Sequence, residues 1–178
     1  MSPWNPFKSD PLPAAAATLY ASMVTQARHP DFYTVGGVPD SIDGRFEMVA
    51  LHGYLVLGRL RGAGGQAERL SQALVDAFFA DMDASLREMG AGDLGVGKRV
   101  KRMATAFYGR LAAYEAGEGA GDLAEALRRN LFGTVVPRPS QVAAMVAYVE
   151  AARAALAKQQ LDEIMAARLV FPALEPIA

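Results

Sequence analysis

The segment DAFFADMDASLREMGAGDLGVGKRVKRMATAFYGR, residues 76–110, decides the fold because it joins two helical patterns through a run of glycines. On each side of the glycines, apolar residues recur at intervals of three and four, which is the spacing of one helix face. These residues are Val75, Phe79, Met82, Leu86 and Met89 before the glycines, and Val100, Met103, Phe107, Leu111 and Tyr114 after them. We therefore predict two amphipathic helices separated by a hinge at Gly90–Gly97.

The charges change sign across this hinge. Asp76, Asp81, Asp83 and Glu88 precede it, whereas Lys98, Arg99, Lys101 and Arg102 follow it. Four cations at a helix start oppose the helix dipole, which favours negative charge there by about 0.3 to 1 kcal/mol per exposed group. We expect acidic compensation from this chain or from a partner, and an i,i+4 ion pair between Asp83 and Arg87. The acidic helix then serves either as one side of a structural ion-pair network or as a patch for a partner.

Upstream of this segment, residues 45–61 are apolar on most faces, so we predict a central buried helix. Its apolar residues are Phe46, Met48, Val49, Leu51, Tyr54, Leu55, Val56, Leu57 and Leu60. Arg45, His52 and Arg59 recur every seven residues and mark its polar edge. We expect His52 to be hydrogen-bonded in or beside the core, and Glu47 to lie on another face, where it does not orient the histidine.

Further helices flank this central pair of patterns. The alanine-rich segment 14–28 ends at Pro30 and leads into a loop at 30–42, with Asp43 as the predicted N-cap of the next helix. A capping-box-like start at Asp122 opens a short helix to about Phe132. Ser140 is the predicted cap of another helix, continued by residues 161–169, and the last ten residues look extended. No segment reads as a strand.

The sequence thus predicts an all-α protein: one compact domain of six or seven helices over residues 14–178, with a mobile proline-rich arm at 1–13. Its formal net charge of -1 gives no overall attraction to nucleic acid or to anionic membranes. Because the chain has no cysteine, it forms no disulfide or thiolate site. The first residues lack the pattern of a signal peptide, and no apolar run reaches the roughly 20 residues that span a bilayer. We expect a cytoplasmic protein.

Two nucleotide-binding patterns occur in the predicted hinge. Gly90–Gly95 spells GxGxxG, but a helical pattern precedes it where a parallel strand is needed. Gly92–Lys98 spells GxxxxGK, but Arg99 stands where such loops carry Ser or Thr for magnesium. Asp81 and Asp83 lack the glycine and glutamate of a calcium loop. A nucleotide-binding enzyme that uses Gly90–Lys98 remains the weakest alternative, and no cofactor or metal is expected.

A second alternative is an RNA or ribosome adaptor. The basic run 98–102 flanks an apolar stripe, and Tyr108, Arg110 and Tyr114 add stacking and hydrogen-bonding groups. The same features suit a protein interface. A composition of 52% hydrophobic residues and a mean hydropathy of +0.11 indicate apolar surface that a partner covers.

The blocks DGRFE, LH, DMD, LRE, GDL, VGK and FYGR follow one another between about Phe32 and Phe132. In order and spacing they resemble the ubiquinol-cytochrome c chaperone family, whose members are assembly factors of the cytochrome bc1 complex. The resemblance implies a chaperone rather than an enzyme, acting without a cofactor, a small-molecule substrate or DNA. It implies newly synthesised cytochrome b as the client. Contact with the cytoplasmic face of the inner membrane or with the ribosome stays open.

The charged residues around the hinge are therefore the candidate protein-binding residues. They are Asp81, Asp83, Arg87, Glu88, Asp93, Lys98, Arg99, Lys101, Arg102, Tyr108 and Arg110.

Overall fold

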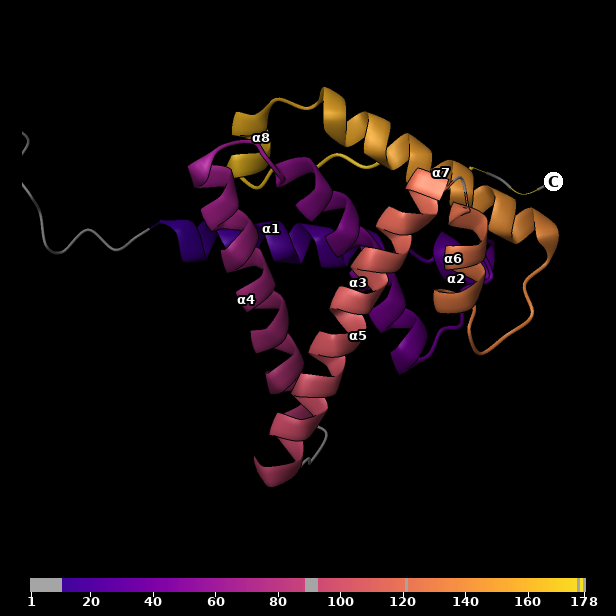
Figure 1. Ribbon diagram of the computed structural model, residues 1–178, viewed down its shortest axis with the longest axis horizontal. Helices are drawn as coiled ribbons and strands as arrows, with labels where there is room; N and C mark the ends of the chain where they lie inside the picture. Colours follow the sequence, from indigo (N-terminus) through magenta and orange to yellow (C-terminus); the bar gives the residue numbers. More distant parts are fainter. Residues whose placement is uncertain (1–10, 89–92, 121, 176, 178) are drawn as a thin grey trace, which may run out of the picture.

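The computed structural model describes residues 11–88, 93–120, 122–175 and 177, without the side chains of residues 93, 94, 119 and 120. These residues form eight helical segments and no strand, so the all-α prediction is confirmed for the described part of the chain (Figure 1). Six segments have eight or more residues, and two are single short turns of helix. They are α1 Leu12–Ala27, α2 Asp31–Thr34, α3 Ile42–Leu60, α4 Gly65–Glu88, α5 Asp93–Ala120, α6 Leu123–Asn130, α7 Pro139–Lys158 and α8 Leu161–Met165.

Helix α3 is the centre of the molecule, as the sequence predicted. It packs against α1, α4, α5 and α7. Every residue from Glu47 to Val56 is buried, which removes all faces of nearly three helical turns from water. His52, expected on a polar edge, is 0% exposed, whereas Arg45 faces solvent. The apolar composition of this segment therefore determines that helices surround it.

The start of α3 differs from the expectation in two ways. The loop predicted at residues 30–42 contains the short helix α2, and the N-cap is Ser41 rather than Asp43. The Ser41 hydroxyl accepts a hydrogen bond from the Gly44 N–H at 3.1 Å, which satisfies one free donor of the first turn. At Gly44, an added Cβ atom would lie 1.9 Å from the Pro39 carbonyl oxygen. Only glycine lets the chain turn this closely onto α3.

Helices α4 and α5 form a V that is closed at the end where residues 88 and 93 lie (Figure 1). Phe78 of α4 stacks on Phe107 of α5 with ring centroids 4.5 Å apart. Phe78 is therefore the core aromatic of α4, and the predicted Phe79 is only partly buried. The predicted hinge is wrong for residues 93–97, because Gly95 and Gly97 lie inside α5. Residues 89–92 of that hinge, like residues 1–10 of the predicted arm, lie outside the described residues.

Two other predicted caps are not formed. Asp122 makes no side-chain hydrogen bond to the start of α6. Ser140 lies within α7, whose start is stabilised instead by Gln141, the side-chain oxygen of which accepts a hydrogen bond from the Arg138 N–H at 2.8 Å. Both corrections concern the side chain that satisfies a helix end, and neither changes the order of the helices.

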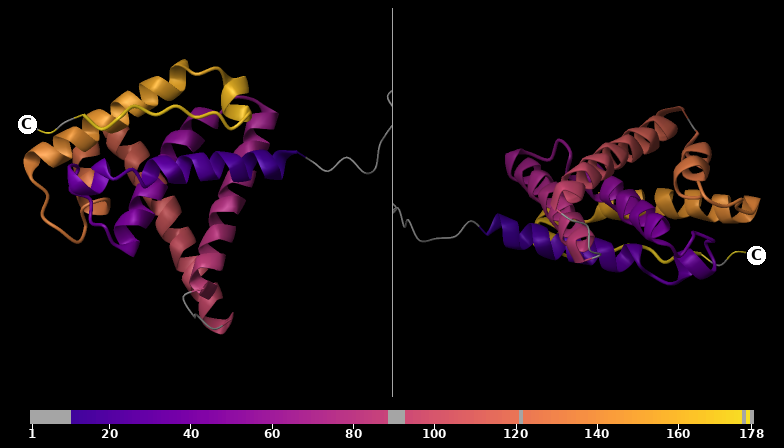
Figure 2. Two further views of the ribbon diagram at one scale, coloured as in Figure 1. Left: turned by 180° about the vertical axis from the view of Figure 1, so that it is seen from behind. Right: turned by 90° about the horizontal axis from the view of Figure 1, so that it is seen from below.

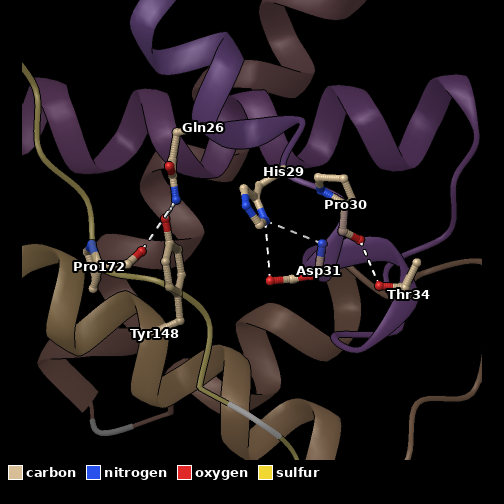
Figure 3. Close-up of polar contacts among 7 residues, drawn as sticks. All are labelled: Gln26, His29, Pro30, Asp31, Thr34, Tyr148 and Pro172. Carbon is tan, nitrogen blue, oxygen red and sulfur yellow. Dashed lines mark hydrogen bonds and ion pairs between the residues drawn. The ribbon is translucent and has the colours of Figure 1, made fainter.

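The C-terminal segment, residues 166–175, runs back along α7 and over α1 (Figure 2). The Gln159 side chain ties it to the end of α7, since it donates to the Val170 carbonyl at 2.7 Å and accepts from the Val170 N–H at 3.1 Å. On α1, the Gln26 amide donates to the Pro172 carbonyl at 3.4 Å and to the Tyr148 hydroxyl at 3.2 Å (Figure 3). The apolar tail predicted to be extended thus packs on the protein itself.

His52 completes this network and confirms the prediction of a hydrogen-bonded core histidine. Its Nδ1 lies 2.8 Å from the Met48 carbonyl, and its Nε2 lies 2.7 Å from the Tyr148 hydroxyl. A carbonyl only accepts, so Nδ1 carries the proton and Nε2 accepts from Tyr148. Burial lowers the pKa of His52 to about 4, because the charged imidazolium is poorly solvated there. The neutral ring therefore links α3, α7 and, through Tyr148 and Gln26, α1.

We expect Gly44→Ala to destabilise the protein by about 1 to 3 kcal/mol, because the new methyl group collides with the Pro39 carbonyl. The matched control is Gly58→Ala in the same helix, where a Cβ atom meets nothing within 4 Å. That substitution should be neutral or stabilise by up to about 1 kcal/mol. Urea unfolding measures both changes in free energy, and equal effects of the two substitutions would contradict the close approach at Gly44.

We also expect stability to fall as the pH drops from 6.5 towards 4. Folding keeps His52 neutral, whereas the unfolded chain binds a proton below about pH 6.5, so acid favours the unfolded state. The contribution is at most about 1.4 kcal/mol per pH unit. His52→Gln should be less stable at pH 7 and should show a shallower dependence on pH across this window. Parallel free-energy profiles for the two proteins would refute a neutral buried His52.

Candidate functional site

A groove of about 990 Å³, here called the arginine groove, lies in the described part of the chain. Its walls come from the end of α1, the start of α3, the second half of α4, α5, and the segment from the end of α6 to residue 134. The lining residues are Tyr20, Arg28, Pro39, Ile42, Asp43, Gly44, Arg45, Phe46, Glu47, Val49, Asp81, Met82, Ser85, Leu86, Arg99, Arg102, Met103, Ala106, Arg110, Arg129, Asn130, Leu131, Gly133 and Thr134. Ser41 and Gly44 shape one wall by setting where α3 begins.

The groove contains apolar side chains that the core only partly covers. Phe46 of α3, Met82 of α4 and Met103 of α5 are half-buried and line it together. Ile42 is 70% exposed at the first residue of α3. Methionine is flexible and polarizable, so such side chains adapt to partners of different shape. The groove can therefore bury an apolar segment of another molecule.

A partly buried ion pair forms part of the wall. Arg110 of α5 holds Glu47 of α3 with two bonds, from Nη2 to Oε1 at 2.7 Å and from Nε to Oε2 at 3.0 Å. Burial raises the pKa of Glu47, and the bond from Arg110 opposes that rise. The Arg110 side chain is 30% exposed and that of Glu47 9%, so loss of Arg110 would leave the more buried carboxylate without its partner. Glu47 was not among the predicted site residues, since its partner lies 63 positions away along the chain.

Asp81 is also engaged within the protein. The Tyr20 hydroxyl of α1 donates a hydrogen bond to Asp81 Oδ2 at 2.7 Å. Burial raises the pKa of Tyr20 most, and this hydrogen bond raises it further. The phenol therefore keeps its proton and remains a donor. The bond fixes α1 against α4 at the edge of the groove.

Several arginines in the groove have no carboxylate to pair with. Six arginines but only three carboxylates line it. Arg45 pairs with Asp40 at 2.7 Å, and Arg110 pairs with Glu47. No carboxylate of the described residues lies within 4.0 Å of the other four, which are Arg28, Arg99, Arg102 and Arg129. The groove therefore carries an excess of positive charge.

The structure separates the predicted site residues into two groups. Four of them line the arginine groove: Asp81, Arg99, Arg102 and Arg110. Six do not line it: Asp83, Arg87, Glu88, Lys98, Lys101 and Tyr108. Of these, Asp83 and Arg87 form the predicted i,i+4 ion pair at 2.6 Å. Asp93 is the first residue of α5, and its side chain lies outside the described residues.

The expected dipole cost of the basic run does not arise. Lys98 is the sixth residue of α5, and the dipole effect falls off within the first turn. Among the described residues, no acidic side chain pairs with Lys98, Arg99, Lys101 or Arg102, so the predicted compensation from the acidic helix is absent there. Within the basic run, Arg99 and Arg102 line the groove, and Lys98 and Lys101 do not.

Other kinds of site have weaker support. A second cavity of about 640 Å³ lies between α3, α5 and α7. Charged residues that line it are paired with one another, Arg61 with Glu115 and Arg153 with Glu118. Residues 93–98 of the GxxxxGK pattern are helical, although a phosphate-binding loop needs open backbone there. Within the described residues, no cluster of three or more His, Asp or Glu could hold a metal ion, and no helix is long and apolar enough to cross a membrane.

Comparisons with known proteins relate this fold to one family. The family model described as ubiquinol-cytochrome C chaperone matches residues 34–171, which extends beyond the resemblance found between about Phe32 and Phe132. The ubiquinol-cytochrome-c reductase complex assembly factor 1 of Xenopus laevis is 25% identical over 137 residues, covering 76% of this chain and 68% of that protein. The mouse protein is 27% identical over 137 residues, and this chain spans only 46% of its length.

A solved structure agrees along almost the whole chain. The crystal structure of the Cbp3 homolog from Brucella abortus superposes with a TM-score of 0.80 at 37% sequence identity, covering 93% of this chain and 92% of that one. The family match covers well over half of the sequence, and the arrangement of helices is shared. The chain therefore belongs to the ubiquinol-cytochrome C chaperone family.

Proposed function

We propose that this protein binds newly synthesised cytochrome b and assists assembly of the ubiquinol-cytochrome c reductase complex. Family membership carries the general role of chaperone, and the names of its relatives point to this complex. The arginine groove supplies a physical means, because it offers half-buried Phe46, Met82 and Met103 to an apolar segment. The proposed role is binding, without a catalytic step or a cofactor.

The groove suits a client that exposes apolar segments before it is assembled. Burying apolar surface gains roughly 25 cal/mol per Å², so apolar contact with the groove contributes favourably to binding. The charged rim leaves polar parts of the client in contact with water. We propose that the protein meets this client at the membrane surface, where segments of a membrane protein emerge.

The alternative of an RNA or ribosome adaptor receives less support. It needs a wide basic surface with stacking platforms, whereas only Arg99 and Arg102 of the basic run line the groove. The half-buried Phe46, Met82 and Met103 beside them suit an apolar protein segment better than a polyanion.

We expect deletion of the gene to lower cytochrome b and quinol:cytochrome c oxidoreductase activity, while a respiratory complex without cytochrome b keeps its activity. Reintroducing the wild-type gene should restore both. Difference spectra of haem b in membranes and quinol-dependent reduction of cytochrome c are the measurements. Normal levels of both, in a strain with no second member of the family, would reject the assembly role.

The client can be identified in the same deletion strain. A photo-cross-linking residue at Met103, in the groove, should form an adduct with cytochrome b that mass spectrometry identifies. The matched control places the residue at Val170, which is 65% exposed and outside the groove. Adducts with cytochrome b from Val170 alone would mean that the client binds elsewhere.

A further inference from the structure

The pairing of charges in the arginine groove suggests what kind of segment it accepts. Two of its three carboxylates have partners within the protein: Glu47 is held by Arg110, and Asp81 accepts the hydrogen bond of Tyr20. The third, Asp43, is exposed, and it lies close enough to Glu47 to raise the pKa of that residue. Most of the acidic groups in the groove are therefore already engaged within the protein.

The basic side is open. Arg28 at the end of α1, Arg99 and Arg102 on α5, and Arg129 on α6 are exposed, and no carboxylate of the described residues pairs with them. They come from three separate helices and line one groove. A guanidinium group presents a planar fork of N–H donors that matches a carboxylate with two parallel bonds. Four such forks around one groove are complementary to an occupant with several carboxylates.

The apolar residues between these arginines restrict the occupant further. Phe46, Met82 and Met103 favour an occupant with an apolar face, as an amphipathic helix has when it lies in a groove. A nucleic acid would instead need stacking platforms and a wider basic surface. The combination favours a protein segment with apolar residues on one face and Asp or Glu on the other.

We infer that the arginine groove recognises an acidic amphipathic protein segment through Arg28, Arg99, Arg102 and Arg129. The inference rests on the proposed function, because the segment belongs to the client or to a protein that accompanies it. The inference adds a chemical criterion for the bound segment: its apolar face contacts the groove, and its carboxylates are recognised by the arginines.

The test uses the full-length protein and a fluorescent synthetic helical peptide of about 18 residues, or five turns. Leucines recur on one face and glutamates occupy the other, and a second peptide has glutamine in place of each glutamate. Fluorescence anisotropy should give at least about tenfold tighter binding of the glutamate peptide, equal to about 1.4 kcal/mol. Added salt should reduce this difference.

Matched variants separate the groove from general charge. Arg99→Gln with Arg102→Gln removes two cations from the groove, and Lys98→Gln with Lys101→Gln removes two exposed cations of the same helix that do not line it. We expect the first pair to weaken binding of the glutamate peptide at least about tenfold and the second pair less than about twofold. Arg99→Lys with Arg102→Lys keeps the charge without the fork and should bind with intermediate affinity.

Several results would overturn the inference. Equal affinity for the two peptides would remove the role of carboxylates, and equal losses in the two glutamine double variants would show attraction by net charge alone. Binding of oligouridine that the Arg99 and Arg102 changes abolish, with peptide binding intact, would assign the groove to RNA. If cytochrome b still cross-links at Met103 in the arginine double variant at wild-type yield, carboxylate recognition fails while the proposed client remains.

Discussion

The enclosure of α3 is the constraint on which the rest of the structure depends. Ten consecutive buried residues leave this helix no face for water, so neighbours must cover it on every side. Helices α1, α4, α5 and α7 provide that cover, although they come from opposite ends of the sequence. The first turn of α3 lies outside this enclosed stretch, and it forms a wall of the arginine groove. Core and site are thus two parts of one helix.

The boundary between these parts is set by the Glu47–Arg110 pair. A buried ion pair gains little net stability, because desolvation of both charges offsets their attraction. Its consequence is geometric: the paired bonds at 2.7 and 3.0 Å hold α5 against the start of α3. Arg102 and Arg99 lie about two and about three turns earlier on the same helix, so this anchor also places the unpaired cations beside the groove.

Local patterns in the sequence determined much of the fold but little of the site. The apolar composition of residues 45–61 predicted the buried helix, and helical spacing predicted α4 and α5, although Phe78 rather than Phe79 is the core aromatic of α4. Caps were less predictable, because Ser41 and Asp43 are chemically similar candidates two positions apart, and the backbone alone decides between them. Glycines misled the reading of residues 93–97, where α5 tolerates Gly95 and Gly97 without any contact that requires them. The groove itself joins residues far apart in the sequence, so no local pattern contains it.

The contacts of the C-terminal segment also impose an order on how the fold is completed during synthesis. The hydrogen bond from Gln26 on α1 to the Pro172 carbonyl cannot form until Pro172 has been synthesised, 146 positions later. At about 5 to 20 residues per second, translation separates the two by about 7 to 30 seconds. The hydrogen bond between His52 and the Tyr148 hydroxyl likewise requires a residue that is synthesised 96 positions later. Helices α1, α3, α4 and α5 can pack during that interval, but one side of α1 and α3 stays uncovered. During that interval the protein itself exposes apolar surface that the finished fold covers.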